Sequence, residues 1–352
     1  MSLSVKVRAR DAERTKKELD RNGCLDKSRK IHEEEGYIFI PISGKKGCDI
    51  SSEHSFSRKK LIQKNKNEGF KERIIRFLSS EEKERVKTSY DIVGDLAILE
   101  IDEDLRKREK KIAEALLESN KVVNGVFRKS SAHEGKYRTQ KLKYLAGEQR
   151  LETMHKENGI RLKLDIEKVY FSVRQSTERK RIAEKVRDQE KVLVLFSGCG
   201  PFPCVIAKRS SPKFICGVEI NPIGHRYAIE NVELNRLDNI YLLNEDAKNV
   251  DKIRESFAHI AEHDGYFDRI IMPHPSDCES FLPYALEFAK DGTVIDLYTF
   301  SDEDKIKEKE VSMHESCIEL GWKSSINESV LCGQHSPGKF RICIEFKVKK
   351  NK

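Results

Sequence analysis

The second half of the chain alternates short apolar runs with amphipathic segments, which predicts alternating strands and helices. Apolar runs lie at residues 191–196, 214–220, 240–245, 269–273, 293–300 and 340–348. Helical periodicity separates them at residues 204–210, 222–237, 281–290 and 304–321. Because strict strand–helix alternation is typical of a mostly parallel sheet covered on both faces, we predict an α/β, Rossmann-like, doubly wound domain over residues 169–352.

The first half predicts two smaller α+β domains. Residues 1–45 read as strand, helix and strand, and residues 46–68 are charged without an apolar period, which predicts a linker. Residues 69–168 form the expected middle domain, with a strand pair around Gly94 and Asp95, a helix over 106–119, and later strands.

Composition narrows the class of protein. No apolar stretch approaches the roughly 18 residues of a membrane span, and the N-terminus becomes charged without an apolar centre, so we expect a soluble, cytoplasmic protein. The nine cysteines are scattered without C-x-x-C spacing, which predicts free thiols and no metal site. The formal net charge of +8 favours an anionic partner.

Basic residues concentrate between Arg128 and Leu145, where Tyr137 and Tyr144 lie among them. The six basic residues of this segment are Arg128, Lys129, Lys136, Arg138, Lys141 and Lys143. Basic groups suit phosphates and aromatic rings suit unstacked bases, so the segment predicts an RNA-binding loop. A solvated charged face remains the alternative.

The ends of the predicted parallel strands carry the candidate chemistry, because ligands of such sheets bind there. After the first strand, Gly198 and Gly200 permit a sharp turn, while Pro203 stands where a dinucleotide fingerprint has a third glycine. S-adenosylmethionine has no pyrophosphate and does not require that glycine. Glu219 ends the second strand, where it can accept hydrogen bonds from ribose hydroxyls.

Two further strand ends complete this pattern. Asp246 follows the third strand and can meet an adenine amine, and the proline-containing segment 273–277 follows the fourth, where a methyl acceptor would lie. Each feature alone fits an ordinary turn. Together, at successive strand ends, they predict a transferase that uses a nucleoside cofactor.

Longer motifs make the prediction specific. The segment VYFSVRQSTERKRIAEKV, followed by a strand and FSGCGPF, resembles the archaeal and eukaryotic tRNA guanine-37 N1-methyltransferase family. The resemblance extends upstream through SYDIVGDLAILEI, GVFRKSSAHEGKYR and MHKENGIRLKLDIEK, and downstream through EINP to FRICIEFKV. It covers nearly the whole chain, and the N-terminal strand–helix–strand segment is similar to the first domain of that family.

The resemblance implies a tRNA-reading first domain, a middle domain and a Rossmann-like methyltransferase domain that binds S-adenosylmethionine. It implies that Glu178 is the base that removes the N1 proton and that Arg138 faces guanine O6. The implied cofactor-binding positions are Arg179, Phe196, Gly198, Gly200, Pro201, Glu219, Ile220, Asp246, Ala247 and Pro273. We expect a monomer that binds the anticodon stem-loop and the body of tRNA. The expected tRNA-binding positions are Arg128, Lys129, Lys136, Tyr137 and Lys141.

The chain departs from the family pattern at three places. Val194 replaces an aspartate at the end of the first Rossmann strand, and Val173 replaces the proline of YFSPR. The acceptor motif N-L-P-K reads Pro273-His274-Pro275-Ser276. Two alternatives therefore stay open: a wyosine-pathway enzyme acting on the same nucleotide, by aminocarboxypropyl transfer or carbon methylation, and a tRNA-binding protein without catalysis.

Overall fold

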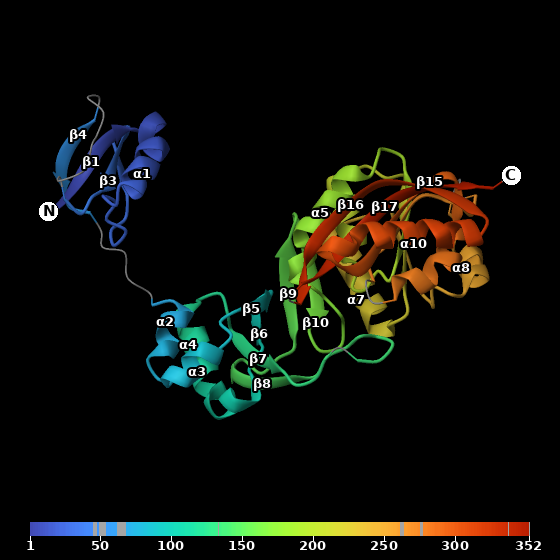
Figure 1. Cartoon of the computed structure of the whole chain (residues 1–352), viewed down its shortest axis with the longest axis horizontal. Helices are drawn as coiled ribbons and strands as arrows, with labels where there is room; N and C mark the ends of the chain where they lie inside the picture. The colour runs from blue at the N-terminus through green and yellow to red at the C-terminus, as the bar shows by residue number, and fades with distance from the viewer. Residues whose placement is uncertain are drawn as a thin grey trace. The chain divides into compact units, whose positions relative to one another are not determined.

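The computed structural model divides the chain into two compact units, Met1–Glu72 and Arg73–Lys352 (Figure 1). It describes residues 1–44, 48, 54–61, 68–132, 134–260, 264–274, 277–336 and 338–351. No helix in these described ranges combines the length and the apolar character that crossing a membrane requires.

The first unit is an antiparallel sheet with one helix packed on it. Its strands lie in the order β2-β3-β1-β4, with bounds His32–Glu34, Tyr37–Pro41, Ser2–Arg8 and Ser55–Lys59. Alternation along β1 directs Val5 and Val7 to one face, where they meet Leu19 of helix α1 (Ala12–Arg21). The expected strand–helix–strand order of this segment is therefore present.

Two features of the first unit differ from the sequence-based expectation. Strand β4 lies in the segment expected to be a linker, yet it pairs with β1 and places its alternating Phe56 against the core. Cys24 and Cys48 form a disulfide, so the expectation that every cysteine is free is wrong for this pair. Sequence spacing does not reveal the pairing because the fold brings the two residues together. The other seven cysteines are free.

The second unit begins with a helical segment and a small mixed sheet. Helix α2 (Phe70–Ile75) lies at the boundary of the two units and is followed by α3 (Ser80–Arg85). The sheet order is β5-β6-β7-β8, with bounds Tyr90–Val93, Leu96–Leu99, Gly125–Lys129 and Leu142–Gly147. Gly94 lies in the turn between β5 and β6 with φ +62°, which explains the glycine there. Helix α4 (Glu109–Ser119) connects the parallel strands β6 and β7.

A hairpin at the end of the segment expected to be the middle domain packs against the domain that follows it. It consists of β9 (Glu152–Glu157) and β10 (Ile160–Asp165). The Asn231 side chain of helix α7 (Pro222–Asn235) accepts a hydrogen bond from the Lys163 amide at 2.7 Å and donates to the Lys163 carbonyl at 3.0 Å. Residues before 169 therefore form part of the scaffold of the larger sheet.

The large sheet confirms the predicted fold class. Its order is β13-β12-β11-β14-β15-β17-β16. The first five strands are parallel, and β17 is antiparallel to both of its neighbours, β15 and β16. The strand bounds are Lys191–Leu195 for β11, Phe214–Glu219 for β12, Ile240–Asn244 for β13, Phe267–Met272 for β14, Ala289–Asp302 for β15, Trp322–Ser336 for β16 and Lys339–Lys350 for β17.

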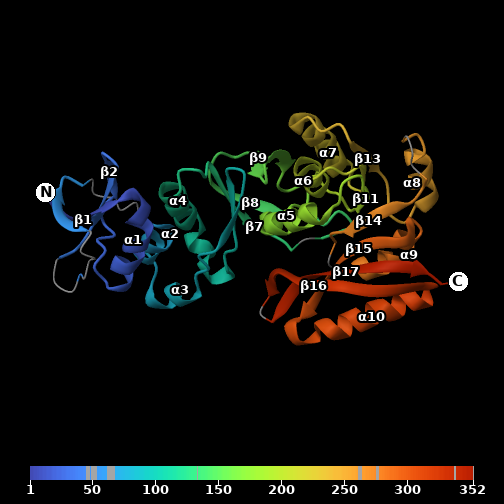
Figure 2. The same ribbon diagram turned by 90° about the horizontal axis from the view of Figure 1, so that it is seen from above.

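Helices cover both faces of this sheet. One face carries α5 (Ser176–Lys185), α6 (Pro201–Arg209) and α7, and the other carries α8 (Val250–Phe257), α9 (Leu282–Leu286) and α10 (Ile306–Glu319). Along β11, the side chains of Val192 and Val194 pack on the face covered by α5, α6 and α7, while those of Leu193 and Leu195 pack on the face covered by α8, α9 and α10. This double burial is why the strand is apolar at successive positions. Figure 2 shows α10 running along the antiparallel strands β16 and β17.

Candidate functional site

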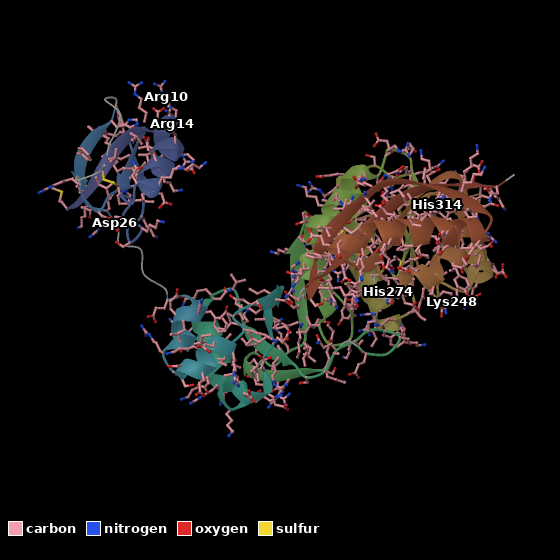
Figure 3. The ribbon with its side chains drawn as sticks, in the orientation of Figure 1. Arg10, Arg14, Asp26, Lys248, His274 and His314 are labelled. Carbon is pink, nitrogen blue, oxygen red and sulfur yellow. A yellow bond between two sulfur atoms is a disulfide. The ribbon has the colours of Figure 1, made fainter. Side chains whose placement is uncertain are left out.

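A cavity of about 690 Å³ lies at the carboxyl ends of the parallel strands, where doubly wound sheets bind ligands. Each of the four strand ends singled out in the sequence contributes to its wall. The predicted cofactor residues on the wall are Arg179, Phe196, Gly198, Pro201, Glu219, Ile220, Asp246, Ala247 and Pro273. Figure 3 labels two residues of this wall, His274 and Lys248. We call this hollow the strand-end cavity.

The loop after β11 has a left-handed backbone at three positions. Phe196, Gly198 and Gly200 have φ values of 60°, 58° and 84°. Gly200 is not on the cavity wall; it is the N-cap of α6, where an added Cβ would lie 3.4 Å from the Cβ of Ala228. The glycines therefore let the chain turn from strand to helix while Gly198 stays open to a ligand.

Glu219 is held rigidly at the end of β12. One carboxylate oxygen accepts a hydrogen bond from the Gly198 amide, and the other accepts one from the Asn221 amide, each at 2.7 Å. Burial raises the pKa of Glu219, and these backbone hydrogen bonds oppose that effect. A fixed carboxylate in the wall is suited to accept hydrogen bonds from vicinal hydroxyls of a ribose.

Asp246 uses one carboxylate oxygen for a hydrogen bond within its own turn. Its Oδ1 accepts a hydrogen bond from the Lys248 amide at 2.9 Å. The Lys248 ammonium lies 5.1 Å from the ring centroid of Phe281, which is also on the wall. Asp246 therefore stabilises its turn, and it also lies on the cavity wall, where a cofactor could contact it.

Unpartnered buried polar atoms point to a polar ligand. Among the described residues, five buried side-chain atoms lack a hydrogen-bond partner, and four of them belong to residues of the cavity wall. These four are Gln175 Nε2, Ser197 Oγ, His274 Nδ1 and Arg341 Nε. Because buried polar atoms are normally paired, their concentration here fits a ligand rich in donors and acceptors, such as a nucleoside.

The basic segment of the sequence divides into two groups. Arg138, Lys129, Lys136 and Tyr137 are on the cavity wall, and the Lys136 ammonium lies 4.9 Å from the ring centroid of Tyr137. Arg138 adopts φ 50°, which is unusual for a residue with a side chain.

The other basic residues of this segment lie elsewhere. Arg128 is 9% exposed and its Nε donates to the Glu109 carboxylate at 2.7 Å. In this structure its guanidinium is therefore engaged in a largely buried ion pair. Lys141 is exposed and lies outside the wall.

Glu178 is not brought to the wall of the strand-end cavity. Arg181 donates two hydrogen bonds to its carboxylate at 2.8 and 2.6 Å, and the Tyr298 hydroxyl donates a third at 2.6 Å. Burial alone would raise the pKa of Glu178, but these hydrogen bonds and the charge of Arg181 outweigh it and lower the pKa. In this arrangement Glu178 is a weak base.

Arg179, expected to contact the cofactor, is occupied by an ion pair. It is 1% exposed and donates two hydrogen bonds to the Glu157 carboxylate at 2.5 and 2.6 Å. It also donates to the Ser172 carbonyl at 3.1 Å, and its guanidinium carbon lies 5.0 Å from the Phe171 ring centroid. Arg179 thus fixes the loop that carries Tyr170, Phe171 and Ser172 along the cavity.

The loop after β14 contributes Pro273 and His274 to the wall, whereas Pro275 and Ser276 lie outside the described residues. The His274 ring packs against Phe196 with centroids 5.1 Å apart. Burial, followed by the positive charge of Arg138, lowers the pKa of His274, so the imidazole is neutral at pH 7.

Sequence reasoning missed several wall residues. Gln175 and Ser197 lie inside motifs that were recognised, but nothing in their spacing marked them as functional. Arg341 and His335 come from the antiparallel strands at the end of the chain, beyond the four strand ends that carried the prediction. The alternation of FRICIEFKV indicated a strand without indicating what its first residues face.

Together, the glycine loop, the fixed acid after β12 and the basic wall define a nucleoside-binding transferase of the Rossmann-like methyltransferase class. Comparison with known proteins agrees. The TRM5/TYW2 methyltransferase domain matches residues 153–322, the TYW2 N-terminal domain matches 70–150, and the tRNA methyltransferase 5 N-terminal domain matches 4–46. The chain belongs to the TRM5/TYW2 methyltransferase family, as its motifs predict.

Its similarity to individual relatives extends over the full length. It is 34% identical over 350 residues to the tRNA (guanine(37)-N(1))-methyltransferase Trm5b of Pyrococcus abyssi, covering 99% of each chain. The crystal structure of Trm5b from Pyrococcus abyssi matches with a TM-score of 0.73 and 33% identity, covering 99% of this chain and 100% of that one. The complex of aTrm5 and tRNALeu matches with a TM-score of 0.69 and 31% identity, covering 98% and 99%.

Proposed function

We propose that this chain transfers a methyl group from S-adenosylmethionine to N1 of guanine 37 in tRNA. One observation carries the proposal: the strand-end cavity joins the nucleoside-binding strand ends to Arg138 and to the loop after β14, so donor and acceptor groups share one hollow. The full-length similarity to proteins that carry this activity in their names supports it.

The cofactor residues follow from the wall. Glu219 would accept hydrogen bonds from the ribose hydroxyls, Asp246 and Ala247 would border the adenine, and the loop Phe196–Pro201 would border the methionine part. Ser197 and Gln175 add the unpartnered polar atoms that such a ligand needs. When bound, S-adenosylmethionine supplies an electrophilic methyl group.

Arg138 is the residue that we assign to guanine O6. N1 of guanine carries a proton at neutral pH, and losing it moves negative charge toward O6. A guanidinium facing that oxygen stabilises the charge more strongly in the transition state than in the ground state. Arg138 is on the wall, and its charge already acts on His274 and His335.

For the proton acceptor we propose Glu178, which would turn toward the cavity together with Arg181 when tRNA binds. Hydrogen bonds of catalytic groups often tighten only in the complex, so the present pairing does not disqualify it. One specific observation favours a second candidate: His274 is already on the wall and neutral, with an unpartnered Nδ1. The two differ in the pH dependence they predict.

For tRNA binding, Lys129, Lys136 and Tyr137 would contact the anticodon loop beside the cavity, and exposed Lys141 would contact a phosphate further out. The first unit would contact the tRNA body. We propose a cytoplasmic enzyme that acts as a monomer, since the described residues that line the strand-end cavity all come from one unit of one chain.

Mass spectrometry of nucleosides tests the proposal directly. Unmodified tRNA transcripts with guanine or adenine at position 37 are incubated with the protein and S-adenosylmethionine. We expect N1-methylguanosine from the guanine transcript only. A parallel incubation supplies tRNA that carries the tricyclic wyosine precursor at position 37. An aminocarboxypropyl or carbon-methylated product there, with no N1-methylguanosine from the unmodified transcript, would favour the wyosine-pathway alternative. Binding of tRNA without binding of the cofactor in calorimetry would favour a protein that lacks catalysis.

A further inference from the structure

An aromatic and cationic cluster at one side of the strand-end cavity is not used by the proposed chemistry. It is built from Phe300 near the end of β15, His335 near the end of β16, and Arg341 near the start of β17, and all three are on the cavity wall. The antiparallel register places Phe300 directly across from Arg341. We call these three residues the hairpin cluster.

The geometry of the hairpin cluster is that of a stack. The rings of Phe300 and His335 have centroids 4.3 Å apart at an angle of 34°, and the guanidinium carbon of Arg341 lies 5.8 Å from the Phe300 centroid. Arg341 also donates to the Tyr170 hydroxyl at 3.5 Å, while its Nε is buried without a hydrogen-bond partner. His335 is exposed, although it packs on Phe300.

The surroundings of His335 are strongly positive. Partial desolvation of the ring is the main cause of a lowered pKa for His335, and the charges of Arg341, Lys339 and Arg138 lower it further, so the ring is neutral at pH 7. A neutral ring stacks without repelling the cations around it, and those cations attract phosphate. Stacking rings inside a basic groove are the arrangement by which proteins hold single-stranded nucleic acid.

A base that is modified inside a cavity must leave its own stack, and its neighbours in the strand then lose a stacking partner. We propose that the hairpin cluster is a second nucleobase subsite, in which His335 and Phe300 stack with the base adjacent to the target base in the same RNA strand. The proposal rests on the proposed function, because it assumes that the cavity receives a base of a single-stranded loop. Arg341 and Lys339 would then face the connecting phosphate.

The test measures tRNA affinity by fluorescence anisotropy, which needs no turnover. His335→Ala should weaken tRNA binding about tenfold, a typical loss for one stacked base. His335→Phe should retain the affinity, because the ring remains. The matched control is His259→Ala, since His259 is also exposed and packs edge-on against Tyr241, with centroids 6.1 Å apart, outside the cavity wall.

A double-mutant cycle identifies the occupant. Transcripts carrying an abasic site on the 5′ or the 3′ side of the target guanine are bound to the wild-type protein and to the His335→Ala variant. We expect one of the two abasic sites to weaken wild-type binding about tenfold and to have no further effect on His335→Ala.

Three results would overturn the subsite. They are unchanged affinity of His335→Ala, loss of affinity in His335→Phe, and fully additive effects with both abasic transcripts. Nucleoside analysis of the wild-type reaction is independent of these: a missing N1-methylguanosine would contradict the proposed function, while the affinity cycle would still report on stacking.

Discussion

At the scale of single residues, Arg138 gives the sharpest test of the proposed chemistry. If it stabilises O6, Arg138→Ala should lower the single-turnover rate at saturating tRNA by roughly 10²–10³ with little change in the salt dependence of binding. Arg138→Lys should restore little, because an ammonium cannot reproduce the planar guanidinium. The control is Lys141→Ala, since Lys141 is exposed and off the wall. It should reduce the salt slope by about one ion and leave the saturated rate unchanged. Weakened binding with normal saturated turnover in Arg138→Ala would reassign Arg138 to a phosphate.

The identity of the proton acceptor is a second residue-scale prediction. A base must be deprotonated to act, so the rate falls below its pKa. The pKa of Glu178 is lowered below its ordinary value of 4.5, whereas the pKa of His274 is lowered from 6.5. If Glu178 is the base, it stays deprotonated between pH 6.5 and pH 5. Protonation of the base should then not lower the single-turnover rate over this pH range. Glu178→Gln should then lower the rate about a hundredfold or more while tRNA affinity is retained.

The control for Glu178→Gln is Glu328→Gln, because Glu328 also accepts a hydrogen bond from Arg181, at 2.6 Å, but is not on the cavity wall. This substitution should leave the rate nearly unchanged. A rate that declines below pH 6.5 in the wild type, and loses that decline in His274→Ala, would identify His274 as the acceptor instead.

The surroundings of a site residue were predictable from the sequence only where its neighbours are close to it along the chain. Glu219 and the glycines occupy the expected strand ends because a parallel strand fixes where its last residue lies. The motif also located Glu178, Arg179 and Arg128, yet each is paired with a residue from another element: Tyr298, Glu157 and Glu109. Such partners depend on tertiary packing, so the sequence could give the type of these groups but not what they contact.

At the scale of elements, the ion pair between Glu157 and Arg179 joins β9 to α5 and predicts a pH-dependent stability. Burial alone would raise the pKa of Glu157, but hydrogen bonds from His155 and Arg179 and the Arg179 charge outweigh it and lower the pKa to about 2. A lowered folded-state pKa stabilises the fold above the unfolded pKa of 4.5, and this contribution is lost as the pH falls toward 2. The full contribution is about 3 kcal/mol.

Urea unfolding at pH 6, 5, 4 and 3 measures this contribution. The wild type should lose about 2 kcal/mol more of its unfolding free energy between pH 6 and pH 3 than Glu157→Gln does, since the other carboxyls titrate in both proteins. Asp104→Asn, which removes a 72% exposed partner of Arg85, should follow the wild-type curve. Parallel curves for wild type and Glu157→Gln would mean that the ion pair does not tie the two elements together.

The elements that sequence predicted best are those buried on both faces or strongly amphipathic. Continuous apolar runs marked the parallel strands β11 and β12, because both faces of the sheet are covered. Strand β16 was missed: much of Trp322–Ser336 is polar and partly exposed at the edge of the sheet, so no apolar run marks it. The missed strand carries His335, which explains why the hairpin cluster was invisible in the sequence.

At the scale of the whole molecule, the described wall of the strand-end cavity lies within the second unit, and the only disulfide among the described cysteines lies within the first. Ligand binding and the disulfide should therefore report on different units. The family resemblance predicted a separate N-terminal domain. The segment expected to be a linker contains strand β4, which shows that the hydrophobic pattern does not reveal a short polar strand at the edge of a sheet.

The disulfide Cys24–Cys48 gives the corresponding prediction. It closes a loop with a sequence separation of 24 and restricts the unfolded chain, which stabilises the fold by about 3 kcal/mol in the loop-entropy account. The doubly substituted variant Cys24→Ser/Cys48→Ser should lower the calorimetric transition of the first unit. It should leave the transition of the second unit and the affinity for S-adenosylmethionine unchanged, because none of the described residues between 1 and 72 lies on the cavity wall. A reductant should shift the wild-type protein in the same way and have no further effect on the variant. A fall in cofactor affinity on reduction, or an unshifted first transition, would show that the two units are coupled or that the disulfide does not constrain the first.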